Sequence, residues 1–370
     1  MMLKLMLSLT ILLASFYSVQ AQYKPQSVWG ARVHYGTIFV HSDSVKNTGG
    51  ASPRGFEIEI AKQWTDTLFK SKYGCYPRTG WSLSYFNYNT PILGSVVNLG
   101  YYIQPVFIIN NHWQWYYKVG LGLGYLSSPY NAETHPDNHS YSLHWNASLQ
   151  ISTGFNYHVN KYYSLTAAAN FLHNSNGCFN SPNRGVNYPG VSLGVEYQPA
   201  GNTWNNYKSH RSHIPHWYNS PWHGEVNTFA GIKHIQNYYY GEKNIINYGL
   251  NAKIIKQYNS FNTFSIGAEI CYDNELRVLN KAFSFNNSNY LLAIMVGHEF
   301  IFPYWIVSTE FGYYIYKDIN DTHQRWAFIY PFLHHWQISY KIDNHWLIGS
   351  GLKAHNQIAD FVDLHLGYRW

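Results

Sequence analysis

The chain has 370 residues, of which 12% are charged and 19% are aromatic, and its formal net charge is +6. A soluble globular domain usually carries about 25% charged residues, and disordered chains are charged and poor in aromatic rings. The composition therefore excludes a disordered chain, and a mean hydropathy of −0.32 excludes a bundle of membrane helices. An all-β protein remains, in a class that includes outer-membrane barrels with aromatic girdles and polar interiors.

The first 21 residues have the features of a secretory signal peptide. Lys4 supplies a positive charge, residues 5–16 form a short apolar stretch, and residues 19–21 (Val-Gln-Ala) resemble a small-residue cleavage site. The alternative is a membrane anchor, which needs about 20 apolar residues, more than this stretch offers. We expect cleavage after Ala21, with Gln22 as the first mature residue.

Apolar and polar residues alternate along most of the remaining chain, which is typical of strands with one apolar face. We count about eight such segments in residues 22–198 and about eight in residues 222–370, and we find no convincing amphipathic helix. Small or polar residues opposite an apolar face suit a barrel whose outside meets lipid. The sequence therefore predicts an antiparallel transmembrane β-barrel.

A polar stretch divides the chain. We predict an eight-stranded barrel over residues 22–198, a linker over residues 199–221, and a second barrel-like unit over residues 222–370; one large barrel of about sixteen strands is the alternative. The last predicted strand ends on Trp370, and a terminal aromatic is typical of bacterial outer-membrane barrels. The linker holds His210, His213 and His216, but without nearby Asp, Glu or Cys we expect a solvated linker and no metal.

Three polar residues interrupt an apolar face where two predicted strands meet. His173 and Ser175 share the parity of Leu165 and Phe171, and Asn187 on the next segment shares the parity of residues 191, 193, 195 and 197. A polar group facing hydrocarbon is costly unless it is hydrogen-bonded. We therefore expect the three side chains to lie near the membrane interface and to bond one another.

A Ser next to a His is the pattern of an activated nucleophile, because the imidazole can take the hydroxyl proton as the oxygen attacks a carbonyl. For a site that faces lipid, the natural carbonyl is that of an acyl ester. The plainer interpretation is a polar rim at a strand end, where Asn, Ser and Gly are ordinary. Spacing alone favours this rim.

The motif resembles a known family. His173, Ser175 and Asn176, followed by Pro182, Asn183 and Gly185, look like the outer-membrane lipid A 3-O-deacylases, and the whole chain resembles their longer, acyloxyacyl hydrolase-like members. The resemblance implies an outer-membrane esterase that remodels lipopolysaccharide by removing an ester-linked acyl chain from lipid A. No cofactor is implied.

The resemblance also implies roles for single residues. Ser175 would be the nucleophile and His173 the general base, and Asn176 and Asn183 would be oxyanion-hole candidates. The acid of the family falls at Asn187, which is a departure, because an amide orients a His without stabilising its positive charge. Glu196 is a poor substitute, since its parity points inward.

We predict that residues 222–370 are a scaffold without an active site. The alternation pattern points His355 inward, and Gln357 occupies the position that Ser175 has in the first half. The expected partners are lipid A and outer-membrane lipid. Nucleic acid is not expected, since the positive charge is not clustered, and the sequence leaves open a homodimer. Because Asn187 departs from the family pattern, we keep a second hypothesis: the protein is a structural or transport barrel that retains the deacylase scaffold without catalysis.

Overall fold

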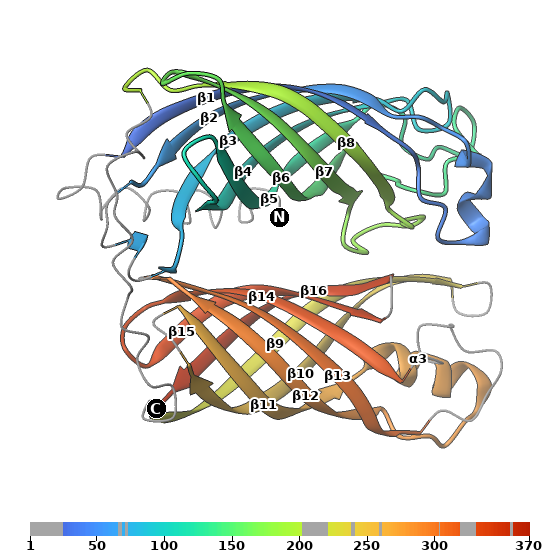
Figure 1. The fold of residues 1–370 in the computed structure, drawn as a ribbon. Helices are drawn as coiled ribbons and strands as arrows, with labels where there is room; N and C mark the ends of the chain where they lie inside the picture. The colour runs from blue at the N-terminus through green and yellow to red at the C-terminus, as the bar shows by residue number, and fades with distance from the viewer. Residues whose placement is uncertain are drawn as a thin grey trace.

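The computed structural model describes residues 25–65, 69–70, 73–201, 221–237, 241–258, 261–302, 304–318, 331–355 and 358–370. Two closed antiparallel barrels follow one another along the chain (Figure 1). The first barrel closes by pairing its first strand with its eighth. Its strands are β1 (Gln26–Gly36), β2 (Arg54–Gln63), β3 (Tyr76–Asn87), β4 (Ser95–Ile108), β5 (Trp113–Leu126), β6 (Trp145–His158), β7 (Tyr163–Ser175) and β8 (Val186–Tyr197).

The second barrel repeats this order and closes by pairing β16 with β9. Its strands are β9 (Trp222–Asn237), β10 (Gly241–Gln257), β11 (Asn262–Tyr272), β12 (Tyr290–Ile301), β13 (Trp305–Lys317), β14 (Phe332–Lys341), β15 (Trp346–His355) and β16 (Ile358–Arg369). The predicted fold class is thus confirmed in its two-barrel form, and the alternative of one barrel of about sixteen strands is wrong. The proposed signal peptide and the three linker histidines lie outside the described residues.

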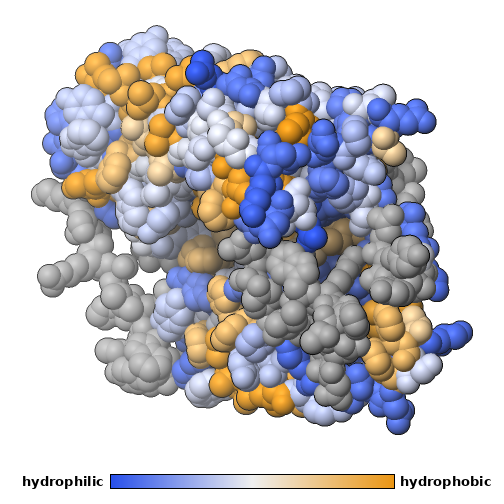
Figure 2. Space-filling view, turned by 90° about the vertical axis from the view of Figure 1, so that its right-hand side faces the viewer, coloured by the Kyte–Doolittle hydropathy of each residue, from blue (hydrophilic) through white to orange (hydrophobic). Residues whose placement is uncertain are grey.

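Alternation places apolar side chains outside both barrels. Leu165, Leu193 and Leu364 are 53%, 64% and 66% exposed, although they belong to regular strands. Apolar surface on this scale is costly in water and suits contact with lipid chains. Figure 2 looks onto the right-hand end of Figure 1, where apolar residues lie toward the margins of the barrels and polar residues cover much of the end of the first barrel.

The interior of the first barrel holds a network of paired charged residues. Lys118 pairs with both Glu57 and Glu59, and Arg32 contacts Glu196 at 3.0 Å. Buried charges are stable only when they are paired and hydrogen-bonded. The inward direction predicted for Glu196 is therefore confirmed. In the second barrel, Lys253 has the same role, with three carboxylates within 3.0 Å, those of Glu225, Glu299 and Glu310.

An α-helix of the second barrel was not predicted. The connection between β11 and β12 contains helix α3 (Asn274–Phe283), which begins where the Asp273 side chain accepts hydrogen bonds from the backbone N–H groups of Glu275 and Leu276. Leu276 and Leu279 turn inward and join the core of the second barrel. The expectation of no amphipathic helix is wrong here, because a ten-residue helix offers too few turns to stand out beside strand alternation. Among the described residues, no helix is long and apolar enough to cross a membrane.

The ends of the first barrel differ. The short helix η1 (Asp43–Thr48) and the β7–β8 loop lie at the right-hand end in Figure 1, together with α3 of the second barrel. At the other end, four-residue turns join β4 to β5 and β6 to β7, and residues 64–75 join β2 to β3. The three residues singled out in the sequence belong to the end that carries η1 and the β7–β8 loop.

Candidate active site

The site is built on one hairpin. His173 on β7 lies directly opposite Asn187 on β8 in the strand register, and Ser175 follows two residues later on the same face of β7. Opposed residues in an antiparallel pair have their side chains within reach of one another. The hairpin alone thus brings together the three residues that the parity argument picked out.

The three side chains form a hydrogen-bonded row. His173 Nδ1 lies 2.6 Å from Asn187 Oδ1, and His173 Nε2 lies 3.0 Å from Ser175 Oγ. Because Asn187 Oδ1 can only accept, Nδ1 carries the proton, and Nε2 is left to accept from the serine hydroxyl. A general base needs this tautomer.

The row lies at the edge of the apolar exterior. Phe171, two residues before His173, is 36% exposed, and Val191, four residues after Asn187, is 57% exposed, whereas Ser175 is 7% exposed. The hydroxyl is thus shielded beside a surface that lipid chains would cover. An apolar surface next to a shielded row of polar side chains suits an acyl ester, which has an apolar chain and a polar carbonyl.

His41 extends the row, and sequence reasoning missed it. It follows β1, which closes the barrel against β8, and Phe39 N–H donates to Asn187 O at 2.8 Å. Asn187 Nδ2 lies 3.0 Å from His41 Nδ1, and His41 Nε2 lies 2.8 Å from Arg184 O. One tautomer satisfies both contacts: Nε2–H donates to the carbonyl, and Nδ1 accepts from the amide.

The direction of this row follows from the amide of Asn187. Its Nδ2 donates to His41, so its Oδ1 faces His173. Phe39 O also lies 3.2 Å from His41 Nδ1. Because Nδ1 carries no proton in this tautomer, it donates no hydrogen bond to Phe39 O. Only the barrel-closing register of β1 on β8, which the sequence does not reveal, could have pointed to His41.

Gly185 makes room for the histidine. Its φ is +75°, and a Cβ at this position would lie 2.6 Å from His173 Cε1. A side chain here would therefore strain the backbone and push the imidazole out of place. The close approach of His173 thus explains why the motif has a glycine at residue 185.

The oxyanion-hole candidates lie in the β7–β8 loop and contact one another. Asn176 N–H donates to Asn183 Oδ1 at 3.0 Å, and Asn176 Nδ2 donates to Ser142 Oγ at 3.2 Å and to Asn180 O at 3.0 Å. The side chain of Asn176 is therefore occupied with bracing the loop. Among the described residues, no hydrogen bond engages Asn183 Nδ2, so it is the side-chain donor that a ligand could use.

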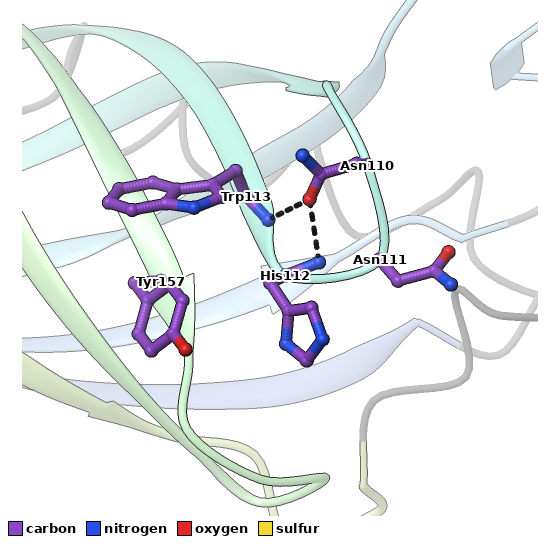
Figure 3. A pocket seen from close by; sticks show the side chains of 5 residues that line it. All are labelled: Asn110, Asn111, His112, Trp113 and Tyr157. Atoms are coloured by element: carbon purple, nitrogen blue, oxygen red, sulfur yellow. Dashed lines mark hydrogen bonds between the residues drawn. The ribbon is translucent and has the colours of Figure 1, made fainter.

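One open hollow of the described surface lies away from this row. It is lined by Asn110, Asn111, His112, Trp113 and Tyr157 (Figure 3). Asn110 Oδ1 accepts from the backbone N–H groups of His112 and Trp113 at 2.9 Å each, which closes the β4–β5 turn. This open hollow is at the opposite end of the barrel from His173, and its polar atoms serve the turn.

The second barrel has a different arrangement at the matching strand. β15 is its seventh strand, as β7 is in the first barrel, and His355 near its end is 1% exposed and lies 2.7 Å from Tyr314 Oη. The inward direction predicted for His355 is confirmed. Among the described residues, no group of three His, Cys, Asp or Glu is placed to hold a metal ion, and Cys75, Cys178 and Cys271 form no disulfide.

Comparisons with known proteins match both halves of the chain. The family model "Lipid A 3-O-deacylase (PagL)" matches residues 16–196, and the model "Acyloxyacyl hydrolase, C-terminal domain" matches residues 222–370. No curated protein matches the chain.

Two solved structures are similar to part of this chain. The outer membrane enzyme PagL is 14% identical, with 45% of this chain and 97% of that chain covered and a TM-score of 0.33. Neisserial surface protein A is 15% identical, with 46% and 96% covered and a TM-score of 0.32. Family models account for both barrels, and the apolar exteriors suit an outer membrane. The chain therefore belongs to the lipid A 3-O-deacylase family of outer-membrane barrels, in the long form that carries the acyloxyacyl hydrolase C-terminal domain.

Proposed function

We propose that this protein is an outer-membrane esterase that hydrolyses an ester-linked acyl chain of lipid A. The hydrogen-bonded row of Ser175, His173 and Asn187 at the edge of the lipid-facing surface carries the proposal. The family match supports the substrate class. Two adjoining features, the polar row and the apolar strand faces, suit a substrate with a polar headgroup and acyl chains.

Ser175 Oγ attacks the ester carbonyl carbon, and His173 Nε2 takes the hydroxyl proton. The carbonyl oxygen becomes an oxyanion, which Asn183 Nδ2 and backbone N–H groups of the loop stabilise. As the C–O bond to the sugar breaks, His173 returns the proton to the departing sugar oxygen. A water then attacks the acyl-serine, with His173 as base, and releases the fatty acid and Ser175.

Asn187 orients the imidazole in this mechanism and supplies no charge. The imidazolium that forms in each step is then less stabilised than it would be beside a carboxylate. His41 acts as a positioning residue, because it holds the amide of Asn187 with Oδ1 toward His173. We expect slow turnover, because the imidazolium forms beside an amide that carries no charge.

The test compares lipid A from cells that express wild type, Ser175→Ala or an empty vector. Mass spectrometry should show loss of one acyl chain with wild type only. Ser27→Ala is the matched control, since Ser27 bonds Lys62 at the opposite end of the barrel, and it should act as wild type. Identical acyl patterns from wild type, Ser175→Ala and vector would refute the proposal.

A further inference from the structure

The two barrels touch beside the candidate site. At one end of the pair, Tyr73 and Phe261 pack with ring centroids 5.2 Å apart. At the other end, the β7–β8 loop of the first barrel reaches the second (Figure 1). There His234 N–H donates to Cys178 O at 3.1 Å, and Cys178 Sγ donates to Ala359 O at 2.9 Å. Cys178 is three residues after Ser175.

The contacted segment has an unusual backbone. Gly177 has a φ of +63° and Cys178 a φ of +65°. The left-handed region is uncommon for a residue with a side chain, and such conformations persist only where the surroundings hold them. The backbone carbonyl and the thiol of Cys178 both form hydrogen bonds with the second barrel. The second barrel is thus the surface that holds this conformation.

The fit at Gly177 is close. A Cβ at this residue would lie 2.8 Å from Val362 Cγ2 on β16. The backbone of the loop therefore packs directly on the second barrel, with no space for a methyl group between them. Any side chain at residue 177 would push the loop and β16 apart.

The same loop carries the oxyanion-hole candidates. Asn176, the residue before Gly177, bonds Asn183 through its backbone N–H and Asn180 through its side chain. The loop thus behaves as one braced unit, and its contact with β9 and β16 fixes where Asn183 lies. A shift at Gly177 would move the donors away from Ser175.

We propose that the second barrel is a positioning surface for the active-site loop, in which Val362 and the backbone of β9 and β16 hold residues 176–185 in the geometry that stabilises the oxyanion. The inference rests on the proposed esterase activity. It gives a function to a barrel that has no Ser/His pair of its own at the matching strand, and it makes Gly177 and Val362 positioning residues.

The test uses the full chain with lipid A in detergent micelles. Gly177→Ala should lower kcat tenfold or more and leave KM within about twofold, since the apolar strand faces are unchanged. Val362→Ala alone should lower kcat less than Gly177→Ala does, because the bonds of Cys178 to His234 and Ala359 remain, and adding it to Gly177→Ala should restore at least half of the lost log kcat. Gly201→Ala is the control for backbone strain, since Gly201 has a φ of +75° with its nearest neighbour 3.6 Å away. It should keep wild-type kcat.

Two further readouts make the outcome decisive. Should Gly177→Ala not fold, Val362→Phe pushes on the same contact from the second barrel and should give the same loss of kcat. Trypsin cleavage at Arg184 reports the loop without activity: it should be faster in Gly177→Ala and slow again in the double variant. Unchanged kcat in both pushing variants, or no rescue by Val362→Ala, would overturn the proposal. No Ser175-dependent hydrolysis by wild type would instead refute the esterase activity alone.

Discussion

Asn187 is the third residue of the proposed triad, and its neutral amide allows the effect of a charge beside His173 to be tested alone. Asn187→Asp exchanges an amide for a carboxylate of the same size, 2.6 Å from His173 Nδ1. A carboxylate stabilises the imidazolium, so we expect kcat to rise about 10- to 100-fold, less than the ~10⁴ known for a serine protease. Initial rates of fatty-acid release by the purified variant provide the measurement.

The control for this change is Asn187→Leu, which removes the acceptor and should lower kcat below the wild-type value. A folded Asn187→Asp protein with an unchanged or lower kcat would mean that charge beside His173 does not limit the rate. In that case the expectation that the amide at residue 187 slows turnover is wrong.

His41 can be tested through the same amide. If it acts by fixing the direction of Asn187, His41→Ala should lower kcat about tenfold and leave KM nearly unchanged. A carboxylate has two equivalent oxygens and needs no such direction, so His41→Ala should have little effect in the Asn187→Asp background. The double-mutant cycle measures this coupling. Equal losses in both backgrounds would show that His41 does not act through Asn187.

The β7–β8 hairpin is the element that sets the position of the imidazole. Gly185→Ala places a Cβ 2.6 Å from His173 Cε1, so we expect at least a tenfold fall in kcat in a barrel that still folds. Gly50→Ala is the matched control, because Gly50 has a similar φ of +79° and no atom within 4 Å of the added Cβ. Heat-dependent gel migration reports folding of both variants. Equal activity of the two would contradict a steric role for Gly185.

Strand alternation made much of the fold and part of the site predictable. Parity alone put His173, Ser175 and Asn187 on one outer face and Glu196 inside, because a strand has a period of two residues. His41 was not predictable in this way, since it follows β1, lies in no alternating pattern, and meets Asn187 only through closure of the barrel. Helix α3 was not predicted, because it is short and the strand-like alternation on both sides of it is the stronger pattern.

At the scale of the whole molecule, the low charge of the chain has a structural reason. Where lipid covers the outside, ionic side chains of the strands are stable inside the barrels, where each needs a partner. Lys118 with two carboxylates and Lys253 with three show how few charges such interiors accommodate. The two barrels then contact through the loop at Cys178, so a scaffold unit and a candidate active site are joined.

The filled interiors lead to a prediction about transport, the alternative to catalysis. An eight-stranded barrel encloses only enough space for its own side chains, and the hollow between Ser82, Asn98 and Gln150 has room for about one water molecule. Ions would also have to pass the network that Lys118 forms with Glu57 and Glu59. The folded full chain should therefore give no unitary current steps in planar bilayers. Steps whose cation selectivity changes in Lys118→Met would identify the lumen as a pore and would favour transport over catalysis.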